Sequence, residues 1–159
     1  MDLSANLPAT VFYRAMNQAE HQPAMPLRLE AYQALPKPRD PQLAARLKTR
    51  MDSCIERLQA YETRLARARS YIQKEYYSNS LLLLAQLVKQ GPEYGALYTE
   101  AQELLNRTSL KKIEFYIVKG QLAKARNALN NARLQGVSTD VLDHLSAKIK
   151  NIEQLKPLR

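Results

Sequence analysis

The sequence predicts an all-α protein in which stacked antiparallel helical hairpins follow a long helix and a proline-rich N-terminal arm. Three observations predict this fold class. The 159 residues include only 4 glycines and no tryptophan, and strong helix formers dominate the rest. Apolar residues recur every three or four positions through most of the chain, and a stretch of 45 residues is repeated. This composition disfavours a β-sandwich, a barrel or a glycine-loop nucleotide fold.

The arm comprises residues 1–41, which contain six of the eight prolines. Between these prolines, apolar residues recur twice at helical spacing and predict two short helices joined by extended linkers. The residues that recur are Phe12, Ala15, Met16 and Ala19, and then Leu27, Ala31 and Leu35. Helices this short are marginal in water unless an apolar face is packed, so we expect the arm to lie on the rest of the chain or on a partner.

One long helix is predicted over residues 42–74, at the start of a helical-repeat domain that extends to residue 155. Pro41 suits the first turn of this helix, and neither glycine nor proline interrupts it. Its apolar stripe consists of Leu43, Leu47, Met51, Cys54, Leu58, Tyr61, Leu65, Ala68 and Ile72. We expect the stripe to pack within the chain, and the alternative is a coiled coil between two copies. Cys54 lies on this stripe and is expected to be an inert core thiol.

Two repeats, 62–106 and 107–151, align without a gap and share ten identical residues over 45 positions. Each repeat predicts three helical pieces. The pieces are expected near 62–74, 77–90, 93–106, 107–119, 121–135 and 138–155. Gly91 and Gly136 follow the middle pieces, where glycine closes a helix in the left-handed conformation. Residues 156–159 form a tail.

Two segments of these repeats resemble the tetratricopeptide-repeat (TPR) class. One segment reads YIQKEYYSNSLLLLAQLVKQGP and resembles the end of a first helix, a short turn and a second helix that ends at proline. Its residues near the aromatic, small, bulky and proline positions of the family are Tyr71, Ser80, Leu84 and Pro92. The other segment reads FYIVKGQLAKARNALNNARLQG and fits the family at its turn, at Lys119, Gly120, Gln121, Leu122 and Ala125.

The resemblance covers about residues 60–150 and implies a short TPR-like solenoid that holds a peptide or a partner helix on its exposed surface. The chain departs from the family in its 45-residue spacing instead of about 34, in the missing tryptophan, and in Ile113, where a small residue is expected. These departures leave two folds open. One is a divergent TPR array, and the other is a different helical-hairpin stack with a third helix in each repeat.

No arrangement of residues typical of catalysis occurs in the sequence. It contains no glycine-rich phosphate loop, no nucleophile elbow and no pair of histidines at metal-binding spacing, since His21 and His144 are far apart. A single cysteine also excludes an internal disulfide and a cysteine-rich zinc site. We therefore expect a protein that is not an enzyme and that needs neither a cofactor nor a metal.

The net charge of +9 is concentrated in two zones, with a net +4 over residues 41–75 and +5 over residues 108–136. Such zones are either solvated helix faces or docking surfaces for an acidic protein partner or nucleic acid. Nucleic acid is the less expected partner, because the basic residues form no continuous run and the tyrosines lie on helix stripes. The candidate partner-binding residues are Lys111, Lys112, Lys119, Lys124, Arg126, Tyr71, Tyr94, Tyr98 and Tyr116.

These observations predict a non-enzymatic protein–protein interaction module, or an adaptor subunit of a larger assembly, that binds a peptide or a partner helix. The alternatives are a basic helical factor associated with nucleic acid and a coiled-coil homodimer. No apolar stretch is long enough to cross a membrane, and we expect a cytoplasmic protein. A soluble domain of a secreted or membrane-associated complex would have the same features. The oligomeric state is left open.

Overall fold

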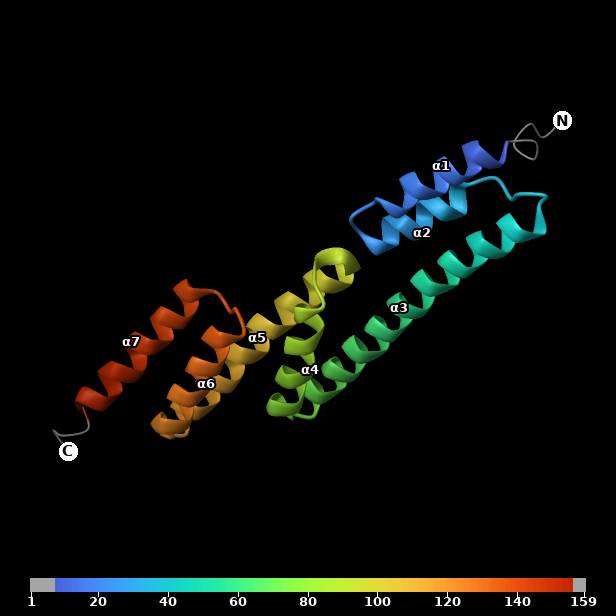
Figure 1. The fold of residues 1–159 in the computed structure, drawn as a ribbon. Coiled ribbons are helices and arrows are strands. Elements are labelled where there is room, and N and C mark those ends of the chain that lie inside the picture. Colours follow the sequence, from blue (N-terminus) through green and yellow to red (C-terminus); the bar gives the residue numbers. More distant parts are fainter. Residues whose placement is uncertain (1–7, 156–159) are drawn as a thin grey trace. The chain divides into compact units, whose positions relative to one another are not determined.

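The computed structural model describes residues 8–155, and these residues form helices joined by short turns, with no strand among them (Figure 1). This confirms the prediction of an all-α protein. The elements are α1 (Ala9–Glu20), α2 (Met25–Ala34), α3 (Pro41–Gln73), α4 (Tyr77–Lys89), a 3₁₀ turn (Pro92–Tyr94), α5 (Ala96–Val118), α6 (Leu122–Leu134) and α7 (Thr139–Leu155). The tail predicted at 156–159 lies outside the described residues. Within residues 8–155, none of the helices is both apolar and long enough to span a bilayer.

The described chain divides into two compact units. The N-terminal unit comprises residues 8–64 and 90–98, and the C-terminal unit comprises residues 65–89 and 99–155. Helix α3 contributes its first part to one unit and its last turns to the other, and it begins and ends within a residue of the predicted range 42–74. The sequence placed a boundary at residue 41, whereas the arm helices belong to the same compact unit as the first part of α3.

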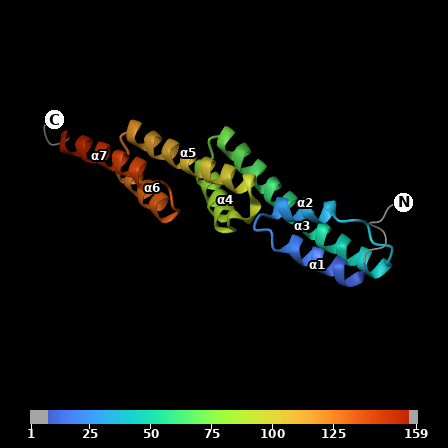
Figure 2. The same cartoon turned by 90° about the horizontal axis from the view of Figure 1, so that it is seen from above.

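In the N-terminal unit, α1 and α2 pack side by side, as both views show (Figures 1 and 2). Their buried residues Phe12, Met16 and Met25 are at most 2% exposed. Polar contacts join α1 to α3, because Arg46 donates a 2.8 Å hydrogen bond to the Tyr13 hydroxyl. The arm therefore lies on the body of its own chain, which is one of the two places predicted for it.

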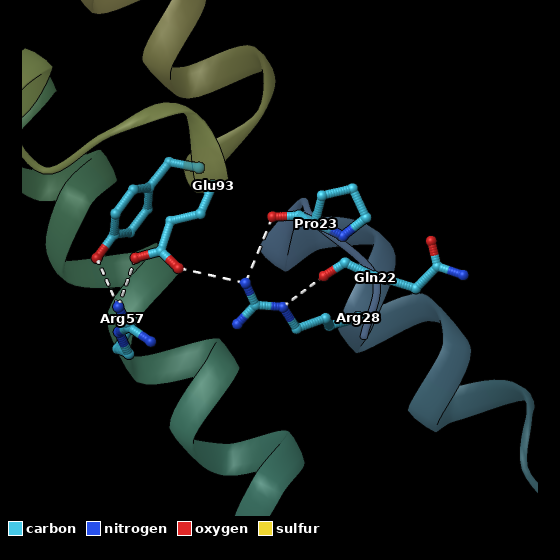
Figure 3. A network of polar contacts seen from close by, with 6 residues as sticks. Gln22, Pro23, Arg28, Arg57 and Glu93 are labelled. Carbon is cyan, nitrogen blue, oxygen red and sulfur yellow. Dashed lines mark hydrogen bonds and ion pairs between the residues drawn. The ribbon is translucent and has the colours of Figure 1, made fainter. Parts of the chain in front are cut away.

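Glu93 in the 3₁₀ turn links this turn to both α2 and α3 (Figure 3). Its Oε1 accepts a 2.7 Å hydrogen bond from Arg57 on α3, and its Oε2 accepts a 3.3 Å bond from Arg28 on α2. Arg28 Nε also donates to the Gln22 carbonyl at 2.7 Å. The neighbouring Tyr94 is buried, and its ring stacks on Tyr61 with 4.3 Å between the ring centroids.

The C-terminal unit contains two helical hairpins and a last helix that packs on the second of them. The end of α3 pairs with α4, where Ser80 bonds to Ala68, α5 and α6 line a common groove, and α7 lies against α6. Ser80, at the small position of the family resemblance, is fully buried in the first hairpin, and its hydroxyl donates a 3.2 Å hydrogen bond to the Ala68 carbonyl. Its equivalent in the second hairpin, Ala125, is also fully buried.

The turns of the two hairpins have the same backbone geometry 45 residues apart. The Tyr76 amide donates to the Tyr71 carbonyl at 2.9 Å, and the Gln121 amide donates to the Tyr116 carbonyl at 2.9 Å. Each turn also contains a residue in the left-handed conformation, Glu75 with φ 61° and Gly120 with φ 72°. The 45-residue alignment therefore pairs turns that close in the same way.

The prediction of separate helical pieces at 93–106 and 107–119 was wrong. A single helix, α5, runs continuously from Ala96 to Val118 across the join between the two repeats. No glycine or proline occurs in this range to end the helix, and buried residues continue across the join at Leu105, Thr108 and Ser109. The helix begins only at Ala96, because the 3₁₀ turn and Gly95, with φ 63°, precede it.

Candidate functional site

Two grooves in the C-terminal unit form the candidate site. The first lies on the α3–α4 hairpin, and the second, named the α5–α6 groove, lies on the other hairpin where α4 adjoins it. The α3–α4 groove has a volume of about 310 Å³ and is lined by Arg67, Tyr71, Asn79, Leu82, Leu83 and Gln86. The α5–α6 groove has a volume of about 160 Å³ and is lined by Ser78, Leu81, Leu82, Ser109, Lys112, Ala128, Asn131 and Gln135. Leu82 of α4 lines both grooves, so they adjoin at this residue.

The two grooves present similar chemistry at positions 45 residues apart. Arg67 in the first is equivalent to Lys112 in the second, and Gln86 is equivalent to Asn131. Each groove therefore combines one cation from the first helix of its hairpin with an amide from the second helix. Between them, the Leu82 side chain is 65% exposed and offers an apolar contact.

The α5–α6 groove contains hydrogen-bond donors that the protein leaves unused. Ser109 is only 2% exposed, and its hydroxyl oxygen has no hydrogen-bond partner among the described residues. Lys112 is half-buried and forms no ion pair with any residue from 8 to 155. Removal from water lowers the pKa of the Lys112 ammonium, since burial disfavours its charged form. Both groups would gain from an acceptor placed in the groove.

Helix geometry places these groups in a row along the hairpin. Ser109, Lys112 and Tyr116 are spaced by three and four residues, so they share one face of α5. Ala128 and Asn131 of α6 and its C-cap residue Gln135 have the same spacing and line the groove from the other side. Beyond this groove, the Lys124 ammonium lies 6.0 Å from the centre of the Tyr116 ring. These side chains lie within the basic zone predicted for residues 108–136.

The structure separates the candidate residues into several environments. Lys112 and Tyr71 each line one groove, and Tyr116 and Lys124 contact each other beside the second. Lys119 lies 5.7 Å from the centre of the Phe115 ring, and Lys111 is exposed. Arg126 faces another way, because it forms an ion pair with Glu153 of α7.

Tyr94 and Tyr98 belong to the N-terminal unit, and the other candidate residues belong to the C-terminal unit. Tyr94 is a core residue that stacks on Tyr61, and Arg57 lies 3.5 Å from its hydroxyl and 5.8 Å from the centre of its ring. The Tyr94 ring therefore offers no exposed surface to a partner.

Sequence reasoning missed Arg67, Leu82, Gln86, Ser109 and Asn131 as site residues. The repeat alignment contains a signal for three of these residues, because it aligns Arg67 with Lys112 and Gln86 with Asn131. Counting identical residues alone concealed this chemical similarity. Nothing in the sequence marks Ser109, since its missing hydrogen bond depends on how the hairpins pack.

No protein-family model matches the sequence, and neither a curated protein nor a solved structure is significantly similar to it. The part of the chain that the structure describes contains no group of His, Cys, Asp and Glu side chains arranged to hold a metal ion.

Proposed function

We propose that this protein is a non-enzymatic protein–protein interaction module, an adaptor subunit of a larger assembly, whose C-terminal unit is a short TPR-like stack. The equal turns of the two hairpins and the buried small residues Ser80 and Ala125 support this stack. Helix α7 covers one face of the second hairpin, as a terminal helix does in stacked repeats.

The observation that carries the proposal is the pair of equivalent grooves. A repeated set of side chains, here a cation and an amide in each hairpin, suits a linear ligand that offers the same group twice. The exposed Leu82 between the grooves adds the apolar contact on which much of the binding free energy of a peptide depends. The ligand is a peptide or a partner helix that crosses both hairpins.

A displayed library of random peptides, selected on the full-length chain, tests this function. We expect an enriched peptide family whose affinity falls about tenfold in Leu82→Ser, because the variant removes an apolar contact at the centre of the site. Leu134→Ser is the matched control, since Leu134 is 87% exposed on α6 and lines neither groove. Failure to enrich any peptide, or equal binding to both variants, would contradict the proposal.

Nucleic acid is the second candidate, because Lys111, Lys119 and Lys124 are exposed and form no ion pair with the rest of the described chain. Two of these lysines already cover the Phe115 and Tyr116 rings, on which bases would otherwise stack. Binding of single-stranded RNA that weakens steeply with salt, and that is lost on reversing these lysines to glutamate, would favour this function.

We do not propose a coiled-coil homodimer. The α3 stripe that would form its seam is already covered within the chain, because Leu47, Tyr61 and Leu65 are at most 7% exposed.

A further inference from the structure

We propose that the two grooves bind an acidic segment of a partner protein in which two carboxylate side chains flank an apolar residue. One carboxylate binds Arg67 and Gln86, the other binds Lys112, Ser109 and Asn131, and the apolar residue contacts Leu82. This inference rests on the proposed function and names the class of ligand that the site takes.

The α5–α6 groove fits a carboxylate group by the donors that it presents. The Lys112 ammonium and the Asn131 amide donate only through N–H groups, and the Ser109 hydroxyl donates once. A carboxylate is an acceptor with about four lone-pair sites, so one such group can satisfy all three donors. No acidic side chain of residues 8–155 lines this groove, so no carboxylate of that part of the chain occupies the place.

Size and charge select a single carboxylate side chain. The groove volume of about 160 Å³ is below the range of about 300–1,000 Å³ typical of small-molecule pockets. Lys112 is the one cation that lines it among the described residues, and it balances one negative charge. A phosphate group carries nearly two charges at neutral pH and would leave part of its charge unbalanced in a half-buried site.

The α3–α4 groove is larger, about 310 Å³, and repeats the selection by charge with a different cation. Arg67 forms no ion pair with any residue from 8 to 155, so its guanidinium is available for a carboxylate. A guanidinium binds carboxylates through two parallel hydrogen bonds. Gln86 and the Asn79 amide line the same groove and add further donors. The two binding positions are therefore chemically alike, and the ligand should be acidic at both.

Leu82 favours an apolar ligand residue between the two carboxylates. It lines both grooves and is 65% exposed, so a ligand that reaches both grooves passes over it. Covering this side chain with an apolar residue stabilises the complex, whereas a charged residue there would lose its hydration without a partner. The ligand pattern is therefore acidic, apolar, acidic.

The test uses acetylated and amidated synthetic peptides in which two glutamates flank one leucine at increasing separations. Each peptide is compared with versions that carry glutamine or phosphoserine in place of each glutamate, and binding to the full-length protein is measured by fluorescence anisotropy. We expect the best glutamate peptide to bind about tenfold more tightly than either single-glutamine version. Lys112→Met and Arg67→Met should each weaken it about tenfold, and their matched control Lys111→Met should leave it unchanged.

A double-mutant cycle assigns each glutamate to its groove. A peptide that lacks the glutamate bound at Lys112 should bind Lys112→Met and the wild type equally well, and it should still lose affinity for Arg67→Met. Ser109→Ala should weaken the complete peptide without lowering the melting temperature of the free protein, because its hydroxyl makes no hydrogen bond in the described chain.

Equal binding of the glutamate and glutamine peptides, or no effect of Lys112→Met and Arg67→Met, would overturn this inference. Tighter binding of the phosphoserine versions would overturn it in favour of a phosphate ligand. If the displayed library enriches apolar peptides that need Leu82 and neither cation, the proposed function stands while this inference fails. If the library enriches nothing, the proposed function fails as well.

Discussion

Glu75 and Gly120 occupy equivalent turn positions in the left-handed conformation, with φ of 61° and 72°. Glycine adopts this conformation without steric cost, whereas an L-residue with a side chain pays about 1–2 kcal/mol. The first hairpin therefore contains backbone strain that the second hairpin avoids. Sequence inspection cannot detect this strain, because glutamate carries no signal for a left-handed residue.

Replacing Glu75 with glycine should stabilise the protein by about 0.5–1 kcal/mol, because relief of strain exceeds the greater entropy of glycine in the unfolded chain. Lys74→Gly is the matched control at the preceding residue, whose φ is negative, and it should lower stability. Urea unfolding of the full-length variants measures both changes. A lower stability of Glu75→Gly than of the wild type would contradict the strain argument.

Ionisation of Tyr61 at high pH should lower the stability of the N-terminal unit. Burial, with a further contribution from Tyr94 and Tyr98, raises the pKa of Tyr61 from 10.0 to about 12. The folded state therefore holds its proton more tightly than the unfolded state does. This contribution to stability is fully present below pH 10 and is lost as the pH rises toward about 12.

Unfolding measured between these two pH values should show a steep loss of stability in the wild type and a smaller loss in Tyr61→Phe. The difference should reach about 3 kcal/mol at most. Tyr76→Phe is the control, because Tyr76 is 55% exposed. Parallel curves for the wild type and Tyr61→Phe would show that ionisation of this tyrosine does not oppose folding.

For the helices, the bounds that follow from the local sequence were predictable. The unbroken stripe from Leu43 to Ile72 predicted α3 to within a residue at each end, and Gly136 predicted the end of α6. The continuity of α5 was missed because the repeat boundary was taken for a helix boundary. The grooves were missed because they depend on packing between hairpins, which no local pattern records.

The arm helices give a prediction. Since α1 packs on α2 and is hydrogen-bonded to α3, limited proteolysis of the isolated protein should spare residues 9–34. Glu93→Gln should expose the α1–α2 turn to cleavage, because Arg28 and Arg57 both lose their ion pair with this carboxylate. We expect a local loss of about 1 kcal/mol, since these pairs are only partly buried.

The control for this experiment is Glu20→Gln, which removes the more exposed pair with Arg50 and should leave the cleavage rate nearly unchanged. Rapid cleavage of the wild type within residues 9–34 would mean that the arm orders only on a partner.

In the whole molecule, the two compact units differ in their proposed roles. The N-terminal unit packs the arm, the first part of α3 and the 3₁₀ turn around a tyrosine-rich core. The C-terminal unit holds both grooves and the whole of the second basic zone. The sequence predicted the class of fold and the basic zone. Which cations of this zone face a groove depends on how the helices pack.

On the proposed function, both grooves bind one partner segment at the same time. The most direct measurement is an NMR titration of the isotope-labelled full-length protein with a peptide enriched from the displayed library. We expect saturable shifts at Arg67, Leu82 and Lys112 with a single dissociation constant, and no shifts across the N-terminal unit. Shifts confined to one groove, or centred on the N-terminal unit, would contradict the claim.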